Sequence, residues 1–181
     1  MSGNYRFTEA LLARCRNIKV LLLDVDGVLT DGGLLYSAQG ETLKRFNTLD
    51  GHGLKMLQSA GITAAVITGR DSEPLRARLA ALGISHARYG IDDKLPAAQN
   101  ILVDLKIDWS QVVSMGDDWP DWPMMKDAAL RCAPSNAHHE ILARADFVSQ
   151  SQGGQGAVRE VCDLLLSASG HYPAIAAKYA L

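Results

Sequence analysis

Apolar and polar residues follow one another along the chain in a pattern that predicts strands and helices in alternation. The apolar run at residues 18–23 predicts a buried strand, and the helically spaced segment before it can be capped by Thr8. From residue 50 onward, short apolar runs alternate regularly with segments of helical periodicity. Strands are expected at 18–23, 62–67, 84–89, 111–115, 129–133 and 146–148, and helices at 8–17, 51–60, 72–82, 93–105, 121–127, 137–144 and 156–168.

This alternation predicts an α/β fold, a Rossmann-like three-layer sandwich in which helices cover both faces of a central parallel sheet. One stretch departs from it: residues 32–46 contain two short strand-like segments around a glycine turn, which predict a projecting β-hairpin. We expect residues 1–168 to form a single domain and residues 169–181 a C-terminal tail. The glycine-rich segment 153–156 indicates a flexible hinge before the last helix.

Composition and charge exclude several classes of protein. The chain has 181 residues, 48% of them hydrophobic, which suits one globular domain with a sizeable core. Its 18 basic and 20 acidic residues give a net charge of −2 without a basic stripe, so nucleic acid is not an expected partner. No apolar run approaches the ~20 residues of a membrane helix, and the three cysteines are widely separated, as free buried thiols would be. We therefore expect a soluble cytoplasmic protein with no membrane partner.

The most informative polar residues stand where the first buried strand ends. Asp24 and Asp26 follow that strand one residue apart, and Gly27 permits a sharp turn. Alternate side chains of an extended segment point to the same side, so both carboxylates can converge on one metal ion or substrate atom while Val25 turns into the core. Because ligands of open α/β sheets bind at the carboxyl ends of the strands, this pair marks a candidate active site.

Later segments bring further reactive groups to the same edge of the sheet. Thr68 and Arg70 follow the next strand of the sheet, Lys94 begins a helix, and Asp117 and Asp118 follow another strand. Hydroxyl, guanidinium and ammonium groups suit a bound anion such as phosphate, and paired carboxylates suit a divalent cation. Because all these ligands are oxygen atoms, the site favours Mg²⁺ over zinc.

These motifs, taken in order, resemble those of the haloacid-dehalogenase superfamily of phosphotransferases. They are Asp24-Val25-Asp26-Gly27-Val28-Leu29-Thr30, Thr68-Gly69-Arg70, Lys94 and Gly116-Asp117-Asp118 with Asp121. The resemblance implies a phosphatase that forms an aspartyl-phosphate on Asp24. Asp26 would protonate the leaving oxygen and then activate water, Thr68 would hydrogen-bond the phosphoryl group, and Lys94 would neutralise negative charge.

The same resemblance implies a Mg²⁺ ion between the nucleophile and the phosphate. Its ligands would be Asp24, Asp117 and the backbone carbonyl of Asp26, and Asp118 would complete the metal site by holding metal-bound water. Helix capping is the alternative role for Asp118 and Asp121, and for Asp121 capping and a metal role remain equally open.

The segments between the motifs are too short for a cap domain, because they hold only the hairpin and ordinary α/β elements. Within the superfamily the sequence is similar to the capless branch that hydrolyses 3-deoxy-D-manno-octulosonate 8-phosphate in lipopolysaccharide precursor synthesis. The similarity extends from about residue 18 to 170 and is carried by Asp31-Gly32, Gly40-Glu41, Phe46, Asp50-Gly51, Pro120-Asp121 and Gly153-Gly154 in addition to the motifs above.

Resemblance to this branch implies a homotetramer whose hairpins pack together and in which the tail of one subunit completes a neighbour's active site. It also implies a small-molecule substrate, a sugar-acid phosphate. The residues that would contact it are Asn47, Thr48, Leu49, Asp50, Gly51, Lys55, Arg70 and Arg78, together with Asp26 and Lys94.

Three residues depart from the branch. Lys55 stands where an arginine is expected, and Trp119 and Trp122 replace smaller apolar residues. Two other functions stay open: a phosphatase for a nine-carbon, sialic-acid-type 9-phosphate, which would present the same carboxylate end, and a non-catalytic oligomerisation module. The intact set of reactive residues argues against the second of these.

Overall fold

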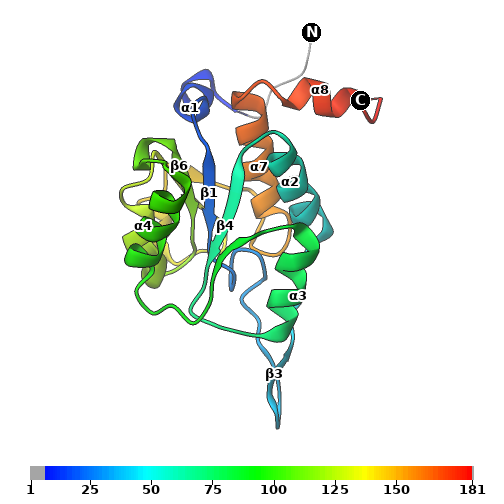
Figure 1. Cartoon of the computed structure of the whole chain (residues 1–181), viewed down its shortest axis with the longest axis vertical. Helices are drawn as coiled ribbons and strands as arrows, with labels where there is room; N and C mark the ends of the chain where they lie inside the picture. Colours follow the sequence, from blue (N-terminus) through cyan, green and yellow to red (C-terminus); the bar gives the residue numbers. More distant parts are fainter. Residues whose placement is uncertain (1–6, 181) are drawn as a thin grey trace.

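Six parallel strands in the order β5-β4-β1-β6-β7-β8 form the centre of the molecule (Figure 1). The computed structural model describes residues 7–180. β1 lies in the middle of the sheet, in parallel register with β4 on one side and β6 on the other. The strands span Val20–Leu23 (β1), Thr63–Ile67 (β4), His86–Arg88 (β5), Val112–Met115 (β6), Leu130–Ala133 (β7) and Phe147–Val148 (β8). The predicted parallel sheet is confirmed.

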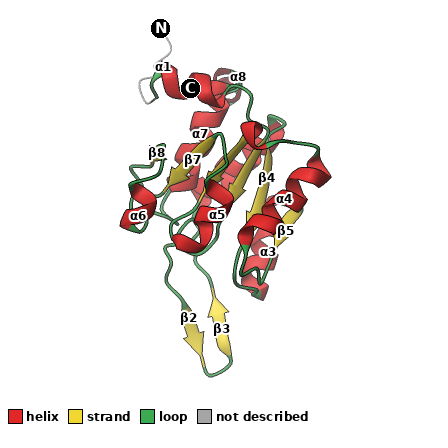
Figure 2. Cartoon of the chain, turned by 90° about the vertical axis from the view of Figure 1, so that its left-hand side faces the viewer, coloured by secondary structure: helices red, strands yellow, loops and turns green. Residues whose placement is uncertain are grey.

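Helices cover both faces of this sheet, as Figures 1 and 2 show from two directions. On one face lie α1 (Glu9–Cys15), α2 (Thr48–Ser59), α3 (Glu73–Leu82) and α7 (Ala157–Ala168). On the other lie α4 (Lys94–Leu105), α5 (Trp122–Met125) and α6 (His139–Leu142). Short 3₁₀ turns at Trp109–Gln111 and Trp119–Asp121 and a final helix, α8 (Tyr172–Ala177), complete the described elements. The arrangement is the predicted three-layer α/β sandwich.

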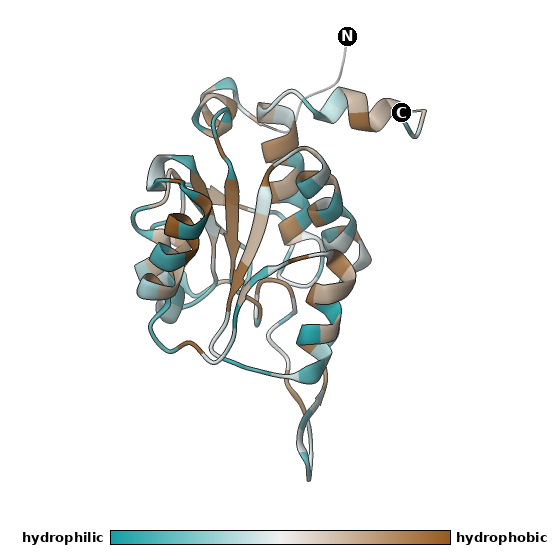
Figure 3. Ribbon diagram, in the orientation of Figure 1, coloured by the Kyte–Doolittle hydropathy of each residue, from teal (hydrophilic) through white to brown (hydrophobic). Residues whose placement is uncertain are grey.

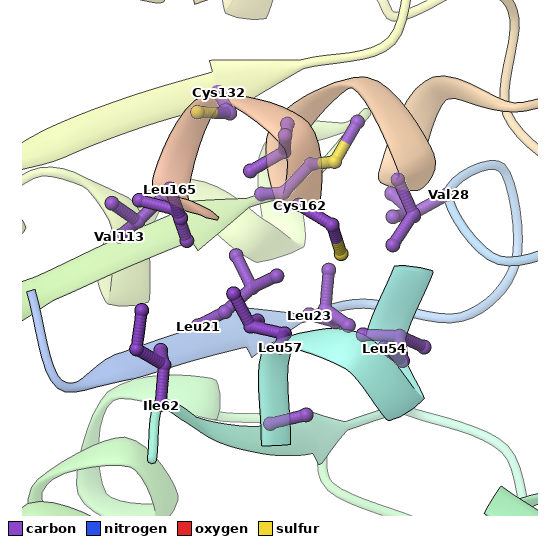
Figure 4. Packing of buried hydrophobic residues seen from close by; sticks show 14 of the residues in the cluster. Leu21, Leu23, Val28, Leu54, Leu57, Ile62, Val113, Cys132, Cys162 and Leu165 are labelled. Carbon is purple, nitrogen blue, oxygen red and sulfur yellow. The ribbon is translucent and has the colours of Figure 1, made fainter. Parts of the chain in front are cut away.

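The alternation of side chains along β1 explains why the sheet has two cores. Leu21 and Leu23 pack toward α2 and α7, whereas Val20 and Leu22 pack toward α4. Figure 4 shows the first of these cores, and Figure 3 shows the strands as an apolar layer inside more polar helices. Each fully buried leucine contributes about 1.5–3 kcal/mol relative to an exposed one, so β1 is anchored firmly on both sides.

Two helical features differ from the sequence prediction. α2 begins at Thr48, three residues earlier than expected, because the Asn47 side chain accepts a hydrogen bond from the Leu49 amide (2.7 Å) and caps the helix. Gly51 and Gly53 weaken the helix signal in this part of the sequence, because glycine is a poor helix former. The tail, in which we predicted no helix, contains α8, and Tyr179, two residues beyond that helix, lies edge-on against His52 of α2 (5.8 Å between ring centroids).

The predicted hairpin consists of β2 (Leu35–Ser37) and β3 (Gly40–Leu43) and projects from the carboxyl edge of the sheet (Figure 2). Its apolar side chains are largely in solvent: Leu35 is 51% exposed, Tyr36 63% and Leu43 62%. A two-stranded hairpin without a core is marginally stable on its own. Its base is instead held by ion pairs to the rest of the chain, among them Arg45 with Asp31.

The glycine segment 153–156 is not a flexible hinge, and that prediction is wrong. Gly153 and Gly154 are buried, and the Gly154 amide donates to the Val28 carbonyl (3.0 Å). A Cβ atom on Gly153 would lie 1.7 Å from the Gly27 carbonyl oxygen, so glycine is required here for close backbone contact and not for flexibility. α7, which follows, belongs to the central core. The predicted division into domain and tail remains a prediction, and residues 1–6 of that domain lie outside the described part of the chain.

Across residues 7–180, none of the helices combines the length and apolar character that crossing a membrane would demand.

Candidate active site

The turn after β1 brings its carboxylates against the loop that follows β6. Gly27 has φ +99°, and a Cβ atom in its place would lie 2.0 Å from Oδ2 of Asp117. Glycine therefore allows two strand ends to approach more closely than any other residue would. Asp24, whose amide donates to the Met115 carbonyl (3.1 Å), is buried at the end of β1. Val25 lies in the apolar core, as the alternation predicts.

Three carboxylates and one ammonium group meet at this edge of the sheet. Asp24, Asp117 and Asp121 each offer an oxygen atom within 4.8 Å of the others. Lys94, at the start of α4, is buried and donates to Asp121 Oδ1 (2.6 Å) and to Asp24 Oδ1. If all four groups are charged, an excess of two negative charges remains, which is the charge that a divalent cation would balance.

The pKa values of these groups reflect the crowding of like charges. Burial, with the Asp121 carboxylate adding to it, raises the pKa of Asp24 to about 7, although Lys94 opposes the shift. Burial and the neighbouring Asp121 and Asp24 carboxylates raise the pKa of Asp117 to about 8. Burial disfavours the Lys94 ammonium, yet Asp24 and Asp121 outweigh it and raise the pKa of Lys94. A bound cation would relieve the repulsion that produces the two carboxylate shifts.

Asp121 and Asp118, for both of which capping was the alternative to a metal role, lie in different places. The Asp121 carboxylate lies in the cluster and accepts from the Asp117 and Asp118 amides (2.8 and 3.2 Å), so it both caps the turn and orients Lys94. Asp118 is exposed, and its carboxylate caps the Trp119 amide (2.8 Å). Asp121 therefore combines the two roles that the sequence left open for it, whereas Asp118 lies outside the carboxylate cluster because the 3₁₀ turn directs its side chain outward.

Asp26 faces a second group of charged residues, on the hairpin side of the turn. The Lys44 ammonium pairs with Asp26 Oδ1 and with Glu41 (2.8 Å). The Arg70 guanidinium lies 3.7 Å from Asp26 Oδ2 and donates to the Tyr36 hydroxyl (3.2 Å). Arg70 therefore lies between the turn after β1 and the hairpin. Thr68 is buried at the end of β4, where its hydroxyl accepts from the Arg70 amide (3.2 Å).

The residues expected to contact a sugar acid do not all point toward one site. The Asp50 carboxylate is buried and accepts from the Gly156 and Arg159 amides (3.3 and 2.8 Å), so it holds the start of α7. Arg78 donates to the Asn47 carbonyl (3.1 Å) and packs against Gly51.

Other predicted contact residues remain available on the surface of the protein. Leu49 and Lys55 are exposed on α2, with Lys55 about two turns beyond Thr48. Asn47 donates to the Gly154 carbonyl (3.3 Å) and lines a cleft of about 480 Å³ beside the hairpin base.

Sequence reasoning missed Lys44, Glu41 and Tyr36 as neighbours of the site. They belong to the hairpin, and their spacing in the sequence carries no information about where the hairpin folds back. The one available signal is the pair Glu41 and Lys44 at i,i+3 beside exposed apolar residues, which is too common on surfaces to single out a site.

The parallel sheet, the carboxylate cluster at its carboxyl edge and the paired lysine define a hydrolase of the phosphoryl-transfer type. A family model described as haloacid dehalogenase-like hydrolase matches residues 90–161. The 3-deoxy-D-manno-octulosonate 8-phosphate phosphatase KdsC of Escherichia coli strain K12 is 45% identical over 160 residues, covering 88% of this chain and 85% of that protein. The chain therefore belongs to the haloacid dehalogenase-like hydrolases, and it is a phosphatase, a phosphoric monoester hydrolase.

Solved structures agree with this assignment. The crystal structure of 3-deoxy-D-manno-octulosonate 8-phosphate phosphatase from Yersinia pestis matches with a TM-score of 0.90 at 42% identity and covers 92% of this chain and 90% of its own. The enzyme of the same description from Moraxella catarrhalis, solved with magnesium ion, phosphate ion and KDO, matches with a TM-score of 0.92 at 37% identity, covering 96% and 99%. Together with the acidic cluster, these relatives support the predicted Mg²⁺ cofactor.

Proposed function

We propose that this protein hydrolyses 3-deoxy-D-manno-octulosonate 8-phosphate to the free sugar acid and inorganic phosphate, through an aspartyl-phosphate intermediate. The observation that carries the proposal is the buried cluster of Asp24, Asp117 and Asp121 around Lys94. The identity of 45% to an enzyme named for this reaction supports this choice of substrate. The product would serve lipopolysaccharide precursor synthesis in the cytoplasm.

The positions of Asp24 and Asp26 on one turn support this reaction. An Asp24 oxygen attacks phosphorus, and the bond between phosphorus and the ester oxygen breaks as Asp26 delivers a proton to that oxygen. Asp26, now a carboxylate, accepts a proton from water as the water attacks the phosphoaspartate and releases phosphate. Lys94 would offset negative charge at the nucleophile, and the Thr68 hydroxyl would hydrogen-bond the phosphoryl group.

Asp24, Asp117 and Asp121 would hold Mg²⁺, together with the Asp26 carbonyl. The ion would supply charge compensation between the anionic nucleophile and the anionic phosphate. The oxygen-only donor set and the two raised carboxylate pKa values support this assignment. Asp118 would not bind the ion itself and would at most hydrogen-bond a water molecule near it.

Arg70 is the best placed of the proposed sugar-acid contacts, because its guanidinium is half-exposed at the hairpin beside Asp26. Asn47, Thr48, Leu49 and Lys55 could contact the substrate at its far end. For Asp50, Gly51 and Arg78 we propose a supporting role instead, since they hold α2 against α3 and α7.

A homotetramer would cover the hairpin and close the uncapped site. Exposed Leu35, Tyr36 and Leu43 supply the apolar surface for a second copy of the chain. Replacing Tyr36 and Leu43 by serine should lower the molar mass in light scattering. A chain ending at Ser169 should keep its fold but lose affinity for substrate if the tail reaches a neighbour's site; unchanged KM would refute tail participation.

Phosphate release from a panel of substrates tests the proposed function directly. The eight-carbon 8-phosphate should be hydrolysed with a higher kcat/KM than a nine-carbon sugar-acid 9-phosphate or glucose 6-phosphate, and EDTA should abolish turnover. Preference for the nine-carbon substrate would favour the alternative phosphatase. Failure to hydrolyse even p-nitrophenyl phosphate with Mg²⁺ present would favour the non-catalytic module.

A further inference from the structure

Lys44 is a buried cation that the reaction described above does not use. It directly follows β3, yet its side chain is only 1% exposed, because it extends from the hairpin to the turn after β1. Burying an ammonium group is costly unless anionic groups compensate it. Lys44 has two such partners, Asp26 Oδ1 and Glu41 Oε1 (2.8 Å).

Glu41 alone balances the charge of Lys44 when Asp26 carries the proton that it donates, and this argues against a role for Lys44 in binding the substrate's own negative charge. Arg70 differs in this respect, because its side chain is 43% exposed and its contact with Asp26 is longer (3.7 Å). The two cations beside Asp26 thus differ in exposure and in their partners. Lys44 is buried and paired with carboxylates, whereas Arg70 remains accessible to a ligand.

The contact with Lys44 makes the two oxygens of Asp26 different. Oδ1 is engaged by an enclosed ammonium, whereas Oδ2 faces the half-exposed Arg70. A proton donor must present one oxygen to the leaving group in a reproducible direction, because proton transfer depends on hydrogen-bond geometry. A carboxylate on a turn can rotate, and an ion pair to one oxygen stops that rotation.

We propose that Lys44 is a positioning residue for Asp26: with Glu41 it holds Oδ1, so that Oδ2 delivers the proton to the leaving oxygen. The inference rests on the proposed function. In the step concerned, Asp24 forms a bond to phosphorus, the ester bond breaks with its electron pair going to the leaving oxygen, and that oxygen takes the proton from Asp26. Lys44 neither gives nor takes a proton.

Two aryl phosphates that differ only in a para-nitro group test this role without any sugar contact. 4-Nitrophenolate leaves without protonation, whereas phenolate needs much more help from an acid. Lys44→Met should therefore lower kcat/KM for phenyl phosphate by about tenfold or more, and that for 4-nitrophenyl phosphate by a smaller factor. Asp26→Asn should show the same pattern more strongly.

Three further variants make the test specific. Lys44→Arg should restore part of the phenyl phosphate activity, because it keeps a cation at Asp26. Glu41→Gln, which retains Lys44, should give a weaker loss with the same dependence on leaving group and replaces Lys44→Met if that variant does not fold. Lys19→Met, an exposed lysine at the opposite end of β1, should match the wild type.

Equal losses on both aryl phosphates would show that Lys44 acts only through general structure, and no loss on either would exclude the positioning role. Both results overturn the inference. Asp24→Asn separates this failure from failure of the proposed function: if that variant keeps its activity, the aspartyl-phosphate mechanism itself is wrong, whatever Lys44 does.

Discussion

Mg²⁺ and protons should compete for the same carboxylates, and lowering the pH is the perturbation that reveals it. Without metal, the pKa of Asp24 is raised to about 7 and that of Asp117 to about 8. Both groups therefore carry protons at pH 6, although an unfolded chain would have lost them. Since a carboxylate must be ionised to bind a cation, Mg²⁺ binding below pH 7 should release these protons.

The sign and size of the effect follow from linkage. Between the unfolded pKa near 4 and the folded values of about 7 and 8, the folded metal-free protein holds more protons than the unfolded chain. The free energy of unfolding without metal should therefore fall as the pH rises through this window. Release of one proton changes the apparent Mg²⁺ affinity about tenfold per pH unit, and release of two about a hundredfold.

Isothermal titration calorimetry with Mg²⁺ between pH 5.5 and 8.5 measures this dependence. The dissociation constant should fall by about 10- to 100-fold per pH unit up to pH 7 and become constant above pH 8. Repeating the titration in buffers of different ionisation enthalpy counts the released protons. An affinity that is the same at pH 5.5 and pH 8.5 would refute the reasoning, and Asp117→Asn should bind Mg²⁺ weakly at every pH.

Three substitutions and one control variant separate catalysis from stability. Asp24→Asn should abolish turnover while raising the thermal stability of the metal-free protein at pH 8, because one crowded negative charge is removed; an active or destabilised variant contradicts this. Asp50→Ala should lower the free energy of unfolding by about 3 kcal/mol in urea titrations, since two amides at the start of α7 lose a charged acceptor. Gly153→Ala should cost about 3 kcal/mol and also reduce kcat, because its Cβ displaces Gly27; Gly61→Ala, which has open space around it, should leave kcat unchanged.

The sheet and most helices could be predicted because their signal is local. Buried strands are apolar runs, and the carboxyl ends of parallel strands meet at one edge, so Asp24, Lys94 and Asp117 could be placed together without coordinates. Side-chain contacts between elements that are distant in the sequence could not be predicted. The residues around Lys44 in the sequence do not predict its ion pair with Asp26. Those around Asp50 do not predict its hydrogen bonds with the amides at the start of α7.

Two differences between the sequence prediction and the structure have a common physical origin. Gly153 suggested flexibility because glycine permits it, but the same absence of a side chain also permits close backbone packing, and only the fold decides between the two. Asp118 and Asp121 were both carboxylates in one short turn, and the direction in which a 3₁₀ turn sends each side chain decides which of them reaches the cluster.

The contact between Gly153 and Gly27 also bears on how the protein is made. The turn that carries Asp24 is synthesised well before the backbone that packs against it, because Gly153 lies more than a hundred residues further along the chain than Gly27. A nascent chain can pair β1 with β4 and still lack this brace, because pairings between distant segments form late. The phosphatase should thus gain activity only after Gly153 has been synthesised, and messages truncated before the codon for Gly153 should yield inactive chains.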